Sequence, residues 1–182
     1  MRRIFCSFVA FAALGSVVGY MVPASGQSNG EAAPIYGIKI PEGYRDWRLI
    51  AVNHLAGGGG KLKQVRAQLG NDMAIKAYRE GRLPFPDGAI IAALHWNEIE
   101  SDENNKVLAV GFPGAGLQSF VAGSPVNIQF MVKDSKRYAA SGGWGYADFT
   151  NGKPGSEALH KTCLPCHEPA KAHDYVFTRY AQ

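Results

Sequence analysis

The most informative residues of this sequence lie close to its C-terminal end, where Cys163-Leu164-Pro165-Cys166-His167 forms a C-x-x-C-H motif. This spacing is typical of the covalent attachment of a c-type haem. Two thiols can add to the two vinyl groups of the haem, and the histidine that follows can bind the iron through an imidazole nitrogen. The sequence therefore predicts one haem c, attached through Cys163 and Cys166 and ligated by His167.

A C-x-x-C pair can also be a redox dithiol or half of a zinc site. A thioredoxin-like dithiol belongs near a βαβ unit, and the sequence contains no such pattern. A zinc site needs two more ligands, but Cys6 lies in a segment that we expect to be removed. His160 and His173 flank the pair at a spacing that matches no common zinc site. Covalent haem is therefore the interpretation that we favour.

The N-terminal segment has the features of a secretory signal peptide over residues 1–26. Arg2 and Arg3 precede an almost wholly apolar run over 4–22, and Ala24-Ser25-Gly26 supplies the small residues that a signal peptidase reads. The alternative is an uncleaved membrane anchor, because the apolar run is close to the minimum length of a spanning helix. We expect cleavage after Gly26, export to the periplasm and a mature chain without a membrane segment. Covalent haem c is assembled outside the cytoplasm, so the signal and the motif support each other.

The composition of the mature chain is that of one folded domain. Cleavage leaves 156 of the 182 residues, which is enough for a sizeable core. Removing residues 1–26, which include Arg2 and Arg3, lowers the formal charge from +4 to +2. No stripe of lysine and arginine is present of the kind that nucleic-acid binding requires, so we expect no nucleic-acid partner.

The pattern of the chain predicts a flexible N-terminal arm over 27–43, rich in Gly, Pro, Ser and Ala, followed by the haem domain over 44–182. Strands are expected over 44–55, 63–69, 89–96, 107–110 and 126–132. Short helices are expected over 73–79, 135–138 and between Ser156 and the haem motif, with a solvated loop over 101–105 and a turn at 123–125. Short strands at nearly regular spacing favour a mainly β (α+β) fold, an antiparallel sheet with a few accessory helices.

The sixth iron position is expected to be open. No methionine follows His167, and Met73 and Met131 are expected to pack in the core. His54 lies upstream as well, and His95 alternates with apolar neighbours in a buried strand, where it could face a haem or be structural. An open iron position permits gas binding or redox chemistry on a small substrate.

Five further pieces of the sequence occur in a distinctive order before and after the motif. They are Tyr44-Arg45-Asp46-Trp47, Pro84-Phe85-Pro86-Asp87-Gly88, Met131-Val132-Lys133-Asp134-Ser135, Gly142-Gly143-Trp144-Gly145 and Asp174-Tyr175-Val176-Phe177. Together with the haem motif they cover nearly all of the mature chain, which in this respect resembles the cytochrome P-460 family and its gas-binding relatives, the cytochromes c′-beta. The resemblance implies a mainly antiparallel β fold, a periplasmic homodimer, thioether bonds at Cys163 and Cys166, and His167 as the iron ligand.

One branch of that family oxidises hydroxylamine at a haem that carries an extra bond from a lysine. That lysine comes from the strand after the proline-aspartate-glycine turn, where this sequence has Leu94-His95-Trp96-Asn97 and no lysine between Lys76 and Lys106. We therefore do not expect the cross-link. The same branch uses a carboxylate just before the haem motif. Glu157 is the candidate for that catalytic role, although it could equally complement a helix dipole.

The gas-binding branch shields its ligand with an apolar aromatic pocket. Phe85, Phe112 and Phe120 are the candidates for this pocket, and each could instead fill the core. The glycines around Trp144 and Tyr146 could let the backbone approach a haem face, or these two aromatics could be core residues.

The function that we expect is the binding of a small diatomic ligand such as nitric oxide. Hydroxylamine oxidation at a lysine-cross-linked haem is the first alternative, with a small nitrogenous substrate. Electron transfer to a protein partner is the second alternative. A structural protein with an accidental motif is the last.

Overall fold

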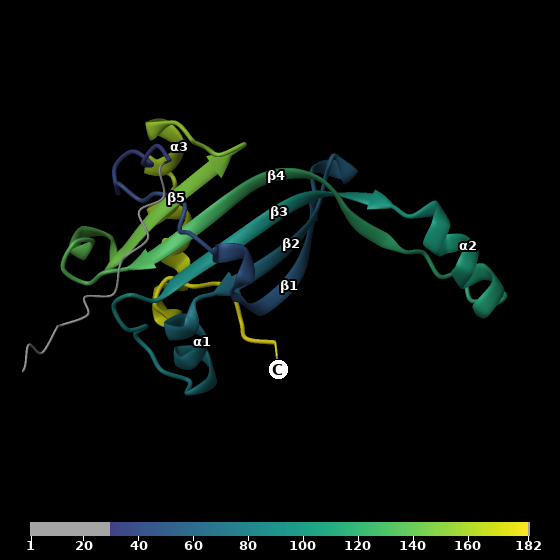
Figure 1. Ribbon diagram of the computed structural model, residues 1–182, viewed down its shortest axis with the longest axis horizontal. Coiled ribbons are helices and arrows are strands. Elements are labelled where there is room, and N and C mark those ends of the chain that lie inside the picture. The colour runs from purple at the N-terminus through teal and green to yellow at the C-terminus, as the bar shows by residue number, and fades with distance from the viewer. Residues whose placement is uncertain (1–29, 182) are drawn as a thin grey trace, which may run out of the picture.

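The computed structural model describes residues 30–181, so the expected signal peptide, Cys6 and the start of the 27–43 segment lie outside the described residues. Six strands form one antiparallel sheet in which each strand pairs with the next one along the chain (Figure 1). The strands are β1 (Arg48–Gly57), β2 (Leu62–Gly70), β3 (Ile90–Glu100), β4 (Phe120–Lys133), β5 (Trp144–Thr150) and β6 (Lys153–Pro154). The predicted mainly β class is confirmed.

Short helices connect and follow the strands. The α-helices are α1 (Asp72–Arg79), α2 (Asp102–Gly111), α3 (Glu157–Lys161) and α4 (Cys163–His167), and the 3-10 helices are η1 (Tyr44–Asp46), η2 (Gly58–Gly60), η3 (Ala139–Ser141) and η4 (Glu168–His173). Within residues 30–181, none of these helices has the length and apolar character needed to cross a bilayer.

The helix predicted over 73–79 is confirmed as α1, and its start follows from Asn71. The Asn71 Oδ1 atom accepts hydrogen bonds from the backbone N–H of Ala74, at 3.0 Å, and of Ile90, also at 3.0 Å. The first bond caps the helix. The second holds the helix at the start of β3, so one side chain joins two elements of the fold.

The loop predicted over 101–105 and the strand predicted over 107–110 are wrong, because both belong to α2. Ser101 caps this helix through a hydrogen bond from the Asn104 N–H to its Oγ atom, at 3.3 Å, and Asp102 and Glu103 occupy the first turn. These are standard signals of a helix start. The apolar run that follows them resembles a short strand, but the capping residues favour a helix over these positions.

Two other boundaries differ from the prediction. β4 begins at Phe120 and passes through the expected turn at 123–125, with shifts of register against β3 near Trp96. Such irregularities accommodate a proline within a strand. The expected helix after Lys133 is a set of turns in which Asp134 Oδ1 accepts the N–H groups of Lys136 and Arg137.

The N-terminal segment packs on the sheet over its described part. Ala33 and Ile38 are 2% and 6% exposed, and the Ala33 N–H donates to the Ile38 carbonyl at 2.7 Å. The Tyr138 hydroxyl donates to the carbonyl of Tyr36 at 3.1 Å. From residue 33 onward the segment is therefore a packed strap on one face of the sheet, rather than the loose arm expected for 27–43.

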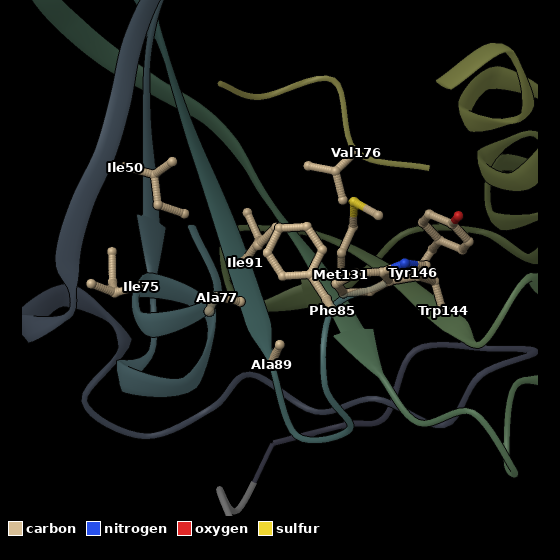
Figure 2. Packing of buried hydrophobic residues seen from close by; sticks show 11 residues of the cluster. Ile50, Ile75, Ala77, Phe85, Ala89, Ile91, Met131, Trp144, Tyr146 and Val176 are labelled. Carbon is tan, nitrogen blue, oxygen red and sulfur yellow. The ribbon is translucent and has the colours of Figure 1, made fainter. Parts of the chain in front are cut away.

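The core consists of two clusters, one on each face of the sheet. The strap and η1 cover one cluster, which includes Leu94, Phe130 and Phe149. The other cluster includes Ile91, Met131 and Tyr146 and lies under α1 and the C-terminal segment; Figure 2 shows these side chains gathered beside Val176. The C-terminal segment thus covers the same sheet face as α1, and this face also bears the site described below.

A buried ion pair fixes the C-terminal segment to the sheet. Lys133 Nζ, at the end of β4, lies 2.7 Å from Asp174 Oδ1, and the two side chains are 5% and 9% exposed. Lys133 also donates to the carbonyl of Gly142 at 3.2 Å and lies over the Trp144 ring. Asp174 Oδ2 accepts the backbone N–H of Phe85 at 2.8 Å. The pair therefore joins the end of the chain to the loop before β3 and to the start of β5.

Replacing Lys133 by methionine should destabilise the protein by about 3–5 kcal/mol, because the Asp174 carboxylate would remain buried without its cation. Urea unfolding of the mature protein, followed by circular dichroism, measures this difference. The exposed Lys136→Met is the matched control and should change the free energy of unfolding by less than about 0.5 kcal/mol. Equal midpoints for the two variants would contradict the role given to the pair.

Candidate haem-binding site

A cavity of about 310 Å³ lies between the sheet and the C-terminal helices. All three residues of the predicted haem attachment line it, namely Cys163, Cys166 and His167 from α4. The sheet contributes the opposite side, from β1 to β5, and the segment after η4 closes the cavity with Val176 and Phe177. The fold therefore brings the haem motif against a sheet face instead of leaving it on an open surface.

His167 is held in the orientation and protonation state of a metal ligand. Its Nδ1 atom lies 2.7 Å from the carbonyl oxygen of Tyr175. A carbonyl can only accept, so Nδ1 carries the proton and the lone pair of the neutral ring is at Nε2. Burial lowers the pKa of His167, which keeps the ring neutral, although the bond to Tyr175 acts in the opposite direction. The rings of Tyr146 and Phe177 lie 5.0 and 5.2 Å from the imidazole and restrict its rotation.

The backbone that presents the Tyr175 carbonyl has an uncommon conformation. Asp174 and Tyr175 both have positive φ angles, 55° and 64°, without being glycines. Such residues persist where the surrounding structure determines them. Here the ion pair with Lys133 holds Asp174 in its conformation. The carbonyl of the next residue, Tyr175, accepts the hydrogen bond from His167.

Cys163 and Cys166 line the cavity together with His167 and form no disulfide with each other. Burial raises the pKa of the Cys163 thiol to about 11, with a further contribution from the charge of Asp148. Ser156 caps α3, just before the motif, through a hydrogen bond to Oγ from the Leu159 N–H at 3.2 Å, as the sequence predicted. The motif therefore begins from a fixed helix start.

His160 is structural rather than a metal ligand. It is fully buried, its Nδ1 lies 2.8 Å from the Ser156 carbonyl, and its Nε2 accepts the backbone N–H of Asp148 at 3.1 Å. Both ring nitrogens are thus used. Among residues 30–181 no group of three or more His, Cys, Asp or Glu side chains could hold a metal ion, so no support for a zinc site is found there.

The register of the sheet arranges the residues on the face that bears the cavity into rows across the strands. One row contains Asn53, Arg66, His95 and Asn127; the next contains Ala51, Gln68, Ala93, Gln129 and Asp148; a third contains Gly70, Ile91, Met131 and Tyr146. The third row is mostly apolar and belongs to the core cluster under α1. The first two rows are mainly polar.

We call the polar side chains of these rows that line the cavity the sheet wall; they are Asn53, Arg66, Gln68, His95, Gln129 and Asp148. Three of them are almost completely buried, with exposures of 4% for Gln68, 5% for His95 and 4% for Asp148. The Gln68 Oε1 atom has no hydrogen-bond partner among the described residues. Buried polar groups normally have partners, so this wall is suited to a bound group that carries polar atoms.

His95 is the histidine of the sheet wall. Burial and the positive charge of Arg66 lower its pKa to about 4, against opposing effects of the Asn127 side chain and the Asp148 charge. The ring is therefore neutral at neutral pH. The structure brings His95 and His167 to the same cavity, while His54 faces away from it and pairs with Glu98 at 2.5 Å.

Other predicted site residues do not reach the cavity. Glu157 is exposed in the first turn of α3, the position that its structural alternative requires, and it also pairs with Lys161 at 2.7 Å. Phe85 is buried in the core cluster under α1, and Phe112 and Phe120 are 58% and 45% exposed near α2. These three phenylalanines therefore form no aromatic shield of the cavity.

The glycine run before β5 approaches the ring of a tyrosine. A Cβ atom on Gly142 would lie 2.2 Å from the ring of Tyr175. Trp144 and Tyr146 are both core residues, as the second alternative for this segment expected, and Tyr146 also lines the cavity.

Sequence reasoning missed the polar members of the sheet wall, apart from His95. Asp148 in particular is a cavity carboxylate that was not among the candidates, although alternation along β5 places it on the same face as Tyr146. A charged residue on the inner face of a buried strand is a signal that could have identified it.

The residues that line the cavity fit a haem c. The cavity combines two thiols, a neutral imidazole with its lone pair at Nε2, apolar side chains from Ile91, Met131 and Val176, and a buried Gln68 oxygen without a protein partner. These are the groups that thioether attachment, iron ligation and contact with a porphyrin require.

The comparisons with known proteins give one family match. The family model for Cytochrome P460 matches residues 41–178, which covers most of the chain and includes the whole cavity. A search of curated proteins finds no match.

Replacing Gly142 by alanine should destabilise the protein and disturb the Tyr175 segment, because the new methyl group would overlap the Tyr175 ring. Gly152→Ala is the matched control, since Gly152 also has a positive φ angle, 77°, but has open space around it. We expect Gly142→Ala to cost about 1–3 kcal/mol more than the control in urea unfolding. A cost equal to that of Gly152→Ala would show that only the backbone conformation matters.

Proposed function

Because this chain belongs to the cytochrome P460 family and is a haem cytochrome, we propose that it carries one haem c, attached to Cys163 and Cys166 and ligated by His167. The observation that carries the proposal is the Nδ1–H bond of His167 to the Tyr175 carbonyl inside a cavity shared with both cysteines. The bond fixes the tautomer and orients the ring, as partners of metal-ligating histidines do. The haem, when bound, supplies an iron that coordinates small ligands and changes oxidation state.

We propose that the protein binds a small ligand, with nitric oxide as the leading candidate, and that it acts in the periplasm after cleavage of its signal peptide. The cavity of about 310 Å³ between α4 and the sheet supports this role. Met131 is packed in the core beside Val176 (Figure 2), and His95 is held in a strand with its own polar neighbours. The described lining of the cavity contains no lysine. This is consistent with a haem that lacks the additional lysine bond.

Hydroxylamine oxidation is the second candidate, and the polar sheet wall favours it. An aromatic shield would suit an apolar gas, whereas the buried side chains of Gln68, His95 and Asp148 suit a ligand with polar hydrogens. Electron transfer to a protein partner is the third candidate, which a side chain at the sixth iron position would favour.

The optical spectrum of the purified, matured protein tests the proposal. We expect a haem that remains on the polypeptide after denaturation, a high-spin ferric spectrum, and a ferrous form that binds nitric oxide stoichiometrically. The ferrous spectrum should be that of ordinary haem c, because no lysine lines the cavity. Cys163→Ala with Cys166→Ala should lose covalent haem. A colourless wild-type protein would reject the haem site, and a low-spin six-coordinate spectrum would favour electron transfer.

We also propose that the protein is a homodimer, as the family resemblance implies, and that the α2 arm contributes to the contact. This arm comprises α2 and the adjoining ends of β3 and β4, and it extends away from the rest of the fold (Figure 1). None of the α2 residues is buried, and Val107, Val110 and Phe112 are 67%, 84% and 58% exposed. An apolar surface on a helix without internal support is typical of an association site.

Charging the arm should separate the two copies. We expect Val107→Glu with Val110→Glu to shift the protein from dimer to monomer in sedimentation velocity, because two carboxylates would be buried on each side of the contact. Val52→Glu, at a 68% exposed position on β1, is the control and should leave the dimer intact. If the Val107→Glu, Val110→Glu double variant remains dimeric, the contact between the two copies does not involve α2.

A further inference from the structure

The sheet wall contains a histidine whose position the haem-attachment motif does not explain. His95 belongs to β3, 5% exposed, in the row that runs from Arg66 through His95 to Asn127. It lines the cavity from the sheet, whereas His167 lines it from α4. A group that fills the space between α4 and the sheet therefore has one histidine from each side within its surroundings.

The His95 ring is in its neutral form. Its burial and the neighbouring Arg66 guanidinium disfavour the protonated form, so His95 is neutral at neutral pH. A neutral imidazole has one N–H donor and one nitrogen that accepts. Because His95 lines the cavity, the unprotonated nitrogen of its neutral ring can accept a proton from a small molecule bound there.

The neighbours of His95 form a chain of polar contacts that fixes its surroundings. Asp148 Oδ2 accepts the Asn127 Nδ2–H group at 2.5 Å and the Gln129 Nε2–H group at 3.0 Å. The backbone N–H of Asp148 is held by His160 at 3.1 Å. Because Asn127 uses its nitrogen towards Asp148, its oxygen end is defined as well.

That oxygen is the acceptor nearest in register to His95. Asn127 Oδ1 is buried and has no hydrogen-bond partner among the described residues, and Asn127 is the direct cross-strand neighbour of His95. The Asn127 side chain favours the protonated ring, which is the effect of an acceptor next to an N–H group. A carboxylate, an amide and an imidazole therefore follow one another from β5 through β4 to β3.

We propose that His95 is the proton-accepting residue of this cavity, and that Asn127 and Asp148 are the residues that position it. The ligand is a small neutral molecule that loses a proton as it binds. Its bond to hydrogen breaks, the electron pair stays with the ligand, and a new N–H bond forms at the unprotonated ring nitrogen of His95. This inference rests on the proposed haem site, because that site places the ligand between α4 and the sheet.

Hydrogen cyanide is the probe that tests this role, because it must lose its proton when it binds ferric haem. The experiment measures its association rate with the matured ferric protein at neutral pH by stopped-flow absorbance. His95→Leu should slow association about a hundredfold, at the lower end of the effect of a positioned base. Asn127→Leu should slow it to a smaller extent, since the imidazole would remain but lose its orientation.

Carbon monoxide is the matched ligand control, because it carries no proton. Its association rate with the ferrous protein should change less than about threefold in His95→Leu, an interval well below the effect of a positioned base. His95→Gln, which keeps a polar side chain without a basic nitrogen, separates proton acceptance from polarity and should resemble His95→Leu. His54→Gln, on the other face of the sheet, should match the wild type for both ligands.

The outcomes separate this inference from the proposed function. Equal slowing of cyanide and carbon monoxide, or an unchanged cyanide rate, would overturn the role of His95 while leaving the haem site intact. A wild-type low-spin spectrum that becomes high-spin in His95→Leu would make His95 an iron ligand and overturn the role as well. A matured wild-type protein without covalent haem would instead reject the proposed function itself.

Discussion

The arrangement of this protein depends on the buried ion pair between Lys133 and Asp174. Lys133 ends the central strand β4, and Asp174 lies on the C-terminal segment, 41 residues further along the chain. The pair is almost completely buried, and the hydrogen bonds to Gly142 and from Phe85 satisfy further polar groups at each end. A buried pair is favourable only when its remaining polar atoms are satisfied in this way. The interaction thus specifies one position for the end of the chain on the sheet.

Four of the sequence pieces that resemble the family converge on this ion pair. The proline-rich turn before β3 contributes the Phe85 N–H and also Asp87, whose carboxylate accepts from the backbone and hydroxyl of Ser135. The glycine run gives space to the Tyr175 ring. Pieces that are distant in the sequence are therefore one structural unit, and the family model extends across all of them. Together they hold the Tyr175 carbonyl within hydrogen-bond distance of His167.

The sequence could predict the class of fold and the attachment residues because both depend on local patterns. Alternation identified the strands around Ala67 and Ile128, an apolar run identified the strand around Ala92, and the helix α1 followed from Asn71. The prediction failed at α2, where a short apolar run fits either a strand or a helix and the Ser101 cap decides. The packed strap was missed because its composition resembles that of a loop, whereas its burial depends on tertiary contacts of Ala33 and Ile38.

The chemistry of the cavity was harder to predict, because it depends on pairing between strands. A side chain such as Gln68 or Gln129 has no distinctive motif, and its place in the sheet wall follows from the register of three strand pairs. A shift by one residue would turn every one of these side chains to the other face. The family resemblance, which implies a carboxylate just before the haem motif, led to Glu157 on α3, which is solvated, while the buried Asp148 comes from β5.

The two buried aspartates show how the fold separates stability from chemistry. Asp174 is paired with a cation, and its role is to hold the chain. Asp148 is as deeply buried, but within the part of the chain that the structure describes it has amide donors and no ion pair. An ionised carboxylate in such a place costs free energy that an apolar side chain would avoid. Sequences depart from the stable choice mainly at functional sites. Asp148 lies on the sheet side of the cavity that is lined by the two cysteines and His167. This location is the physical reason to regard the sheet wall as part of a functional site and not as part of the core.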